Sequence, residues 1–175
     1  MAKIYRFRAL VDYDLDVFRD IEIRTDQHFE DLHLAIQESF GFDNSQMASF
    51  YMSNEDWDKG AEIALFDMRD EGQTSELMLM KETSLESQVT EENQKILYVF
   101  DFLLMWCFYV ELIRTEPAQE GVDYPQVVTA YGDAPDQYSK APDIDLSAFD
   151  DLDLSDMDEW SPESDNPPSA DQAYD

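Results

Sequence analysis

Positively charged residues are scarce in this sequence. Only 11 of its 175 residues are Lys or Arg, against 41 Asp or Glu, which gives a formal net charge of −30 at pH 7. A chain this acidic repels the phosphate backbone of nucleic acids and the headgroups of anionic lipids. We therefore expect no direct nucleic-acid binding and no membrane association. We expect instead a basic protein partner, attracted at long range and in a salt-dependent way.

Cysteine, histidine and glycine are also rare, and each shortage excludes a class of site. The single cysteine, Cys107, permits no intrachain disulfide, and together with two histidines it is too few ligands for a zinc site. The five glycines form no Walker loop, dinucleotide-binding fingerprint or nucleophile elbow. We therefore expect neither a cofactor nor a bound metal.

The sequence has no hydrophobic run long enough to cross a bilayer. The most apolar stretch, residues 96–110, is shorter than the ~20 residues of a membrane helix and carries Asp101 near its middle. The opening residues, MAKIYRFRAL, lack the apolar core of a signal peptide. These features predict a cytoplasmic protein.

Apolar residues make up 43% of the sequence and recur with both strand and helix periods. Alternation over residues 4–11 and 17–24 predicts two paired strands. Thr25 or Asp26 is then expected to cap a helix that ends at Gly41. The apolar residues that share one face of this helix are Phe29, Leu32, Ile36 and Phe40.

Further strands are predicted beyond this helix. Residues 50–52 and 62–66 have short strand patterns, and the aromatic and β-branched run 96–113 is typical of central strands buried on both faces. The polar stretch 67–95 has no assignable pattern. Together these elements predict an α+β domain: a mixed, mainly antiparallel sheet of about five or six strands, with a ββα opening and one main helix on one face.

Composition divides the rest of the chain. We assign the α+β domain to residues 1–115, an irregular extension to 116–140, and a flexible acidic tail, disordered when alone, to 141–175. The tail has 12 acidic residues and no Lys or Arg. It either folds on a partner, docks on its own domain, or is an acidic brush whose apolar residues are incidental. In the first case the partner-binding residues are Phe149, Leu152, Met157 and Trp160.

The helical region also carries a family resemblance. Residues 28–50, HFEDLHLAIQESFGFDNSQMASF, resemble the signature of plasmid pRiA4b ORF-3-like proteins. The opening strands are similar to that family as well, so the resemblance covers residues 1 to about 115. The signature positions are Phe29, Leu32, His33, Ile36, Gln37, Phe40, Gly41 and Phe50.

A second block of the family motif, near residues 101–108, is degraded. Asp101, Phe102 and Trp106 agree with it. Apolar residues stand in place of its polar ones at Leu103, Leu104 and Phe108. Apolar side chains neither bind metals nor move protons, so any site that relatives have there is lost in this chain. The resemblance implies a fold and an accessory role, some members being passengers of mobile elements, and it implies no cofactor.

His33 is the one candidate catalytic residue. A histidine at the edge of an apolar helix face is more often a hydrogen-bonded structural residue, which is the interpretation we favour. We therefore expect a non-enzymatic accessory or protein-interaction protein that uses its acidic surface and its acidic-aromatic tail. The alternative is a mobile-element-associated partner, or a DNA-mimicking inhibitor, of a DNA-acting enzyme. A hydrolase-like enzyme using His33 ranks third.

Overall fold

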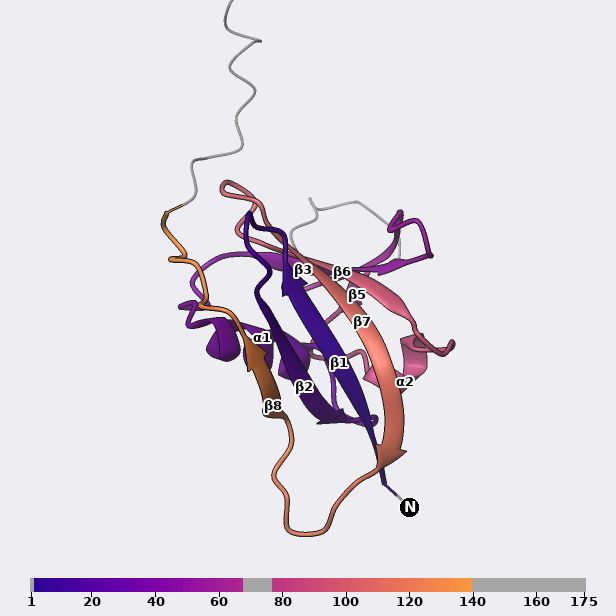
Figure 1. Cartoon of the computed structure of the whole chain (residues 1–175). Helices are drawn as coiled ribbons and strands as arrows, with labels where there is room; N and C mark the ends of the chain where they lie inside the picture. Colours follow the sequence, from indigo (N-terminus) through magenta and orange to yellow (C-terminus); the bar gives the residue numbers. More distant parts are fainter. Residues whose placement is uncertain (1, 68–76, 140–175) are drawn as a thin grey trace, which may run out of the picture. The chain divides into compact units, whose positions relative to one another are not determined.

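The computed structural model describes residues 2–67 and 77–139. They form one eight-stranded sheet, a main helix α1 (Phe29–Phe40) and a short helix α2 (Leu85–Gln88) (Figure 1). The strands are β1 (Lys3–Val11), β2 (Phe18–Arg24), β3 (Ala48–Ser53), β4 (Lys59–Ala64), β5 (Met78–Leu79), β6 (Lys95–Phe100), β7 (Trp106–Pro117) and β8 (Gln126–Tyr131).

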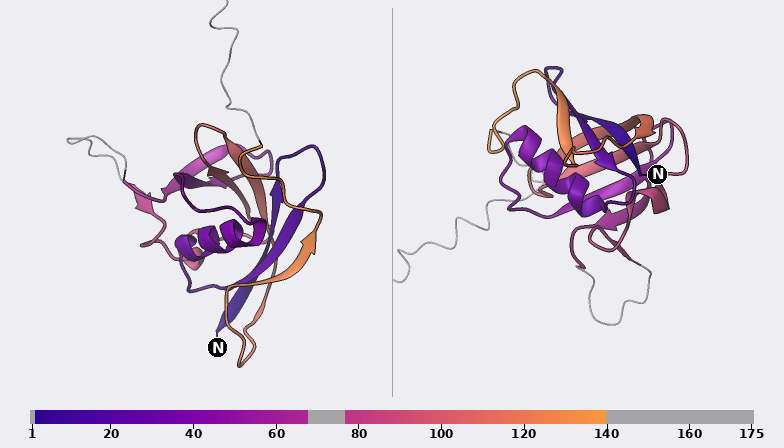
Figure 2. Two further views of the ribbon diagram at one scale, coloured as in Figure 1. Left: turned by 90° about the vertical axis from the view of Figure 1, so that its left-hand side faces the viewer. Right: turned by 90° about the horizontal axis from the view of Figure 1, so that it is seen from below.

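The sheet is mixed and mainly antiparallel, as predicted. Its strand order is β5-β4-β3-β6-β7-β1-β2-β8, and only the β4–β5 pair is parallel. The chain opens β1-β2-α1, and α1 lies against one face of the sheet (Figure 2). The predicted α+β class, the ββα opening and the position of the main helix are therefore confirmed.

The predicted count of five or six strands is wrong, because the described sheet has eight. β5 has two residues, which is too few to show an alternating pattern in the unassigned stretch 67–95. β8 lies in 116–140, where we expected irregular chain. It is an edge strand with no fully buried residue, and its register against β2 shifts between Asp20 and Ile21. Without a buried face, it leaves no alternation in the sequence.

The hydrophobic core lies between α1 and the sheet. The four apolar helix residues named above are all buried, and so are the alternate residues of β1 that face them. Every residue of β6 after Lys95 is buried, which confirms a strand covered on both faces. Aromatic rings fill the space beneath the helix, with Phe40 and Phe108 centred 4.9 Å apart. Each fully buried ring contributes about 1.5–3 kcal/mol to folding.

The two ends of α1 differ in how well the sequence predicts them. Neither Thr25 nor Asp26 caps the helix; the N-cap is His28, whose backbone N–H donates to the Asp31 carboxylate at 2.9 Å. Gly41 ends the helix as predicted. Its φ of 71° lies in the left-handed region, which glycine adopts without a steric penalty.

Residues 77–89 cover the N-terminal end of α1. The backbone N–H of Phe29 donates to the carbonyl of Thr83 at 3.1 Å, and that of Glu30 donates to the carbonyl of Met80 at 3.2 Å. Met80 and Leu85 are buried in the core. This segment thus satisfies backbone donors that a helix leaves without intrahelical partners.

The chain after β8 returns to the loop that follows α1. The carbonyl of Gln137 accepts from the indole N–H of Trp106 at 2.9 Å. The Gln137 side chain exchanges two hydrogen bonds with Asp43, one with its backbone N–H at 2.8 Å and one with its carboxylate at 2.9 Å. Residues well beyond the predicted boundary at 115 therefore contact the sheet and the loop that follows α1.

Candidate functional site

His33 lies in a closed network of hydrogen bonds between helix and sheet. It is fully buried on α1. Its Nδ1 is 2.5 Å from the hydroxyl of Tyr98 on β6, and its Nε2 is 2.6 Å from Oδ1 of Asn44 in the loop after the helix. The amide of Gln37, one helical turn further on, donates to the same Tyr98 hydroxyl at 2.8 Å. The backbone N–H of Asn44 donates to Gln37 Oε1 at 3.2 Å and closes the ring.

Donor and acceptor chemistry determines which nitrogen of the His33 imidazole carries the proton. Oδ1 of Asn44 only accepts, so Nε2 of His33 carries the proton. Nδ1 of the neutral imidazole then accepts from the hydroxyl of Tyr98, which in turn accepts from Gln37. The four hydrogen bonds therefore all run in the same donor-to-acceptor direction around the cycle, and each polar group in the cycle has a partner. This arrangement fastens α1 to β6 and leaves His33 with both ring nitrogens occupied.

We predict that His33 stays neutral through the ordinary histidine range. Burial lowers the pKa of His33, and the hydrogen bond to Asn44 only partly opposes this. A histidine with a lowered folded pKa adds stability above its unfolded pKa of about 6.5, and that stability is lost as the pH falls below it. In an NMR titration the His33 ring signals should keep neutral-form shifts at pH 6.5. A midpoint at or above 6.5 contradicts the closed network.

A groove of about 580 Å³ runs between α1 and the edge strand β8. The helix wall is the stripe of residues spaced i, i+3, i+4 and i+7, which places them on one side of the helix. Leu34 on this wall and Val127 on β8 are 43% and 45% exposed. On the helix side the lining residues are Asp31, Leu34, Ala35 and Glu38, with Ser39 next to Glu38; on the strand side they are Pro125, just before β8, and Gln126, Val127 and Ala130.

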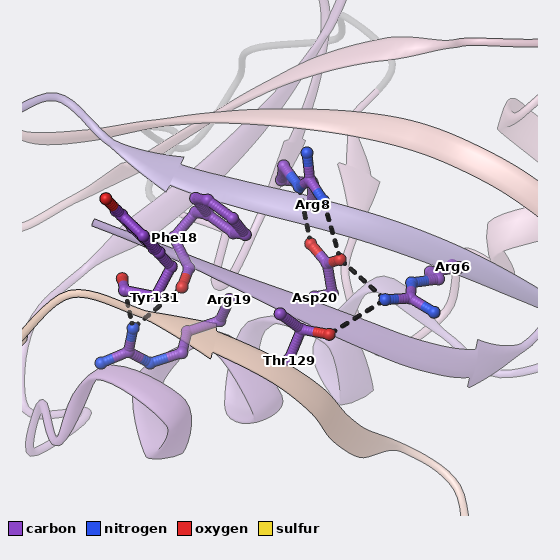
Figure 3. Close-up of polar contacts among 7 residues, drawn as sticks. All are labelled: Arg6, Arg8, Phe18, Arg19, Asp20, Thr129 and Tyr131. Carbon is purple, nitrogen blue, oxygen red and sulfur yellow. Dashed lines mark hydrogen bonds and ion pairs between the residues drawn. The ribbon is translucent and has the colours of Figure 1, made fainter. Parts of the chain in front are cut away.

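Arginines and a buried carboxylate hold β8 on the sheet (Figure 3). On the sheet face away from α1, Asp20 is fully buried and pairs with Arg6 at 2.9 Å and with Arg8 at 2.8 Å. The guanidinium of Arg6 also donates to the hydroxyl of Thr129 on β8 at 3.0 Å. The pairing thus extends across β1, β2 and β8.

Arg19 also lines the groove and is buried. Its guanidinium donates to the carbonyls of Phe18 at 2.8 Å, Ser39 at 3.1 Å and Tyr131 at 3.1 Å. It also lies over the ring of Phe40. One buried guanidinium therefore joins the end of α1 to β2 and β8 through its Nε and Nη1 donors.

A second hollow, of about 470 Å³, lies on the other side of Leu34. His33, Asn44 and the exposed Phe66 line it. We assign the candidate site to the groove, because two elements far apart in the sequence form its walls and both walls carry exposed apolar residues.

The other residues singled out in the sequence are not brought together. Cys107 alternates with the core residues of β7 and lies on the face of the sheet away from His33. Within residues 2–67 and 77–139, no group of three or more His, Cys, Asp or Glu side chains is arranged to hold a metal. No helix in those ranges has the length and hydrophobicity needed to cross a membrane. Phe149, Leu152, Met157 and Trp160 lie outside the described residues.

Comparison with known protein families identifies the family of this chain. Residues 3–142 match the plasmid pRiA4b ORF-3-like protein family. The chain belongs to this family. The match extends past the predicted boundary at 115 and includes β8 and the segment that contacts Trp106. No curated protein matches the chain.

One similar solved structure is that of a protein of unknown function, MM3350, from Methanosarcina mazei Go1. It has 23% sequence identity and a TM-score of 0.69, and the alignment covers 100% of this chain and 91% of that one. At this identity the similarity establishes the fold alone.

The signature of the pRiA4b ORF-3-like family has a structural explanation in this chain. Its apolar helix residues form the buried face of α1, Phe50 is buried on β3, and Gly41 forms the left-handed C-cap. Its two polar residues, His33 and Gln37, both reach Tyr98. In the degraded block, Asp101 accepts from the backbone N–H groups of Leu103 and Leu104, each at 3.1 Å, and shapes the β6–β7 turn.

Proposed function

We propose that this pRiA4b ORF-3-like protein is an accessory protein without catalytic activity that engages a basic protein partner through its acidic surface and its acidic-aromatic tail. The observation that carries the proposal is that most of the chain's few Lys and Arg side chains contact other side chains of the same chain. Six of them form carboxylate pairs or stack on aromatic rings within the chain: Arg6, Arg8, Arg24, Lys59, Lys95 and Arg114.

The consequence of this pairing is a surface dominated by carboxylates. Arg19 is buried and donates to three carbonyls, so it adds no cation to the surface. With a formal charge of −30, the chain attracts basic proteins over the screening length of the solution and repels polyanions. Charge of this kind speeds association and selects the sign of the partner.

Affinity capture from extracts of the cells that encode the chain tests this function. The bait is the full chain, at ~0.05 M and ~0.5 M salt, between which the screening length falls from roughly 14 Å to 4 Å. We expect a protein with Lys- and Arg-rich segments that is retained at low salt and released at high salt. A bait that retains only acidic proteins, or nothing above a bare-resin control, contradicts the proposal.

A matched bait tests the part assigned to the tail. It is the full chain with serine at Phe149, Leu152, Met157 and Trp160, which removes the apolar side chains and leaves the net charge unchanged. Loss of the partner supports tail-mediated contact, and equal retention removes the tail from the proposal. If the partner binds DNA and the chain displaces that DNA, the DNA-mimicking alternative replaces the accessory role.

A further inference from the structure

We propose that the groove between α1 and β8 is the docking site for a short apolar segment of the partner that is bracketed by Lys or Arg. This inference rests on the proposed function and adds the place and the chemistry of the contact. The groove has two walls from elements far apart in the sequence, and the arginine contacts described above fix both walls in position.

The apolar part of the groove is open to solvent on both walls. Leu34 is 43% exposed on the helix and Val127 is 45% exposed on the strand, with Ala35, Pro125 and Ala130 beside them. Burying apolar surface of this kind contributes about 25 cal/mol for each Å² removed from water. A partner segment therefore needs apolar side chains to fill the groove.

The charges around the groove specify what flanks those apolar side chains. Asp31 and Glu38 stand at the two ends of the helix wall, on either side of Leu34 and Ala35. Among the described lining residues Arg19 is the only cation; it is buried, its Nε and Nη1 donate to three carbonyls, and the two carboxylates outnumber it. An incoming Lys or Arg thus meets carboxylates at both ends, whereas an incoming acid is repelled.

The spacing of the two carboxylates sets the spacing of the basic residues. Asp31 and Glu38 are seven residues apart on α1, about 10 Å at 1.5 Å per residue. An extended segment covers that distance in about three residues, at roughly 3.3 Å each. The expected ligand has two basic residues about three positions apart, with apolar residues between or beside them.

Two other occupants fit the groove less well. The chain's own tail has 12 acidic residues and no Lys or Arg after Lys140, so it places like charges against Asp31 and Glu38. A second copy pairing edge to edge along β8 meets the extra residue Val128, where the register against β2 shifts. Irregularities of this kind discourage pairing of sheet edges, and two copies of charge −30 also repel each other.

Selection of peptides from a random library displayed on phage, with the full chain as bait, tests the inference. We expect enriched peptides that combine apolar residues with Lys or Arg about three positions apart. Leu34→Lys should weaken binding of a synthetic copy of an enriched peptide at least about tenfold. Its matched control is Leu15→Lys, the same change at a 68% exposed leucine in the β1–β2 turn, which should leave the affinity within about twofold.

A second pair of variants separates the groove from the overall charge. Glu38→Lys and Glu91→Lys change the net charge equally, but only Glu38 lines the groove. The inference requires Glu38→Lys to weaken binding severalfold more than Glu91→Lys, with all variants melting near the parent. If basic peptides are enriched but both pairs behave alike, the groove is wrong while the proposed function stands. If no basic peptides are enriched, both are wrong.

Discussion

Replacing both Arg6 and Arg8 with methionine is expected to lower the free energy of unfolding by about 3 kcal/mol, as when one side of a buried ion pair is removed. Methionine keeps the aliphatic cover over Asp20 but removes the hydrogen-bond donors. The carboxylate of Asp20 is fully buried and takes hydrogen bonds from both arginines at 2.8–3.0 Å. Without them it is left as an unpaired charge. Urea unfolding of the two proteins measures the loss.

The pH dependence of that loss has a definite sign. Burial alone raises the pKa of Asp20, but hydrogen bonds from Arg8 and Arg6 outweigh it and hold the pKa below its usual value. In the parent, this contribution is complete above the unfolded pKa of about 3.9 and is lost only as the pH falls through the lowered value. In the variant, burial raises the pKa, so stability returns as the pH falls from 7 toward about 4. The difference between the proteins should therefore shrink on acidification.

Two controls distinguish the destabilisation caused by the unpaired Asp20 carboxylate from destabilisation caused by lost side-chain packing. Arg24→Met removes one partner of the exposed pair with Asp26 and should leave the urea midpoint close to that of the parent. Adding Asp20→Leu to the double variant removes the unpaired carboxylate and should recover most of the stability. A double variant as stable as the parent, or a loss that grows on acidification, contradicts the role assigned to this cluster.

Replacing His33 with alanine is expected to cost about 3 kcal/mol. The change opens a cavity under α1, removes the acceptor of the Tyr98 hydroxyl, which still accepts from Gln37, and removes the donor to the Asn44 amide oxygen. His33→Leu separates these effects, because leucine fills much of the space but restores neither hydrogen bond. It should cost about 2 kcal/mol.

The other histidine provides the matched control for this substitution. His28 is partly exposed at the start of α1, and its contact with Asp31 is made by its backbone N–H, which alanine keeps. His28→Ala should therefore cost less than about 1 kcal/mol. Equal losses at the two histidines, or a His33→Leu variant as stable as the parent, would show that the network contributes nothing to folding.

Local periodicity was sufficient to predict the elements with a buried face. The helix with Phe29 and Phe40 on one side, the pair β1 and β2, and the buried strand β6 were all predictable, because burial on one or both faces leaves a pattern in the sequence. β8 has no buried face, so its sequence shows no such pattern. Its place in the sheet depends on pairing with β2, more than 100 residues earlier in the chain.

The candidate site was beyond sequence reasoning for a related reason. Arg6 and Arg8 alternate with the apolar residues of β1 and so lie on its other face, but their shared partner Asp20 depends on the hairpin register that sets Asp20 opposite Arg8. Likewise, His33 stood out as a candidate, whereas its contact with Tyr98 spans 65 residues of sequence. The groove itself exists only because α1 and β8 meet across the fold.

Hydrogen exchange of the full chain, with and without a saturating basic peptide from the selection, tests the central claim most directly. The claim is that the acidic wall of α1 and the edge strand β8 receive a basic segment of a partner. It predicts slower amide exchange in residues 29–40 and 126–131, with the exposed β1–β2 turn at 12–16 unchanged. Slower exchange confined to other parts of the chain, or no change at saturation, would contradict it.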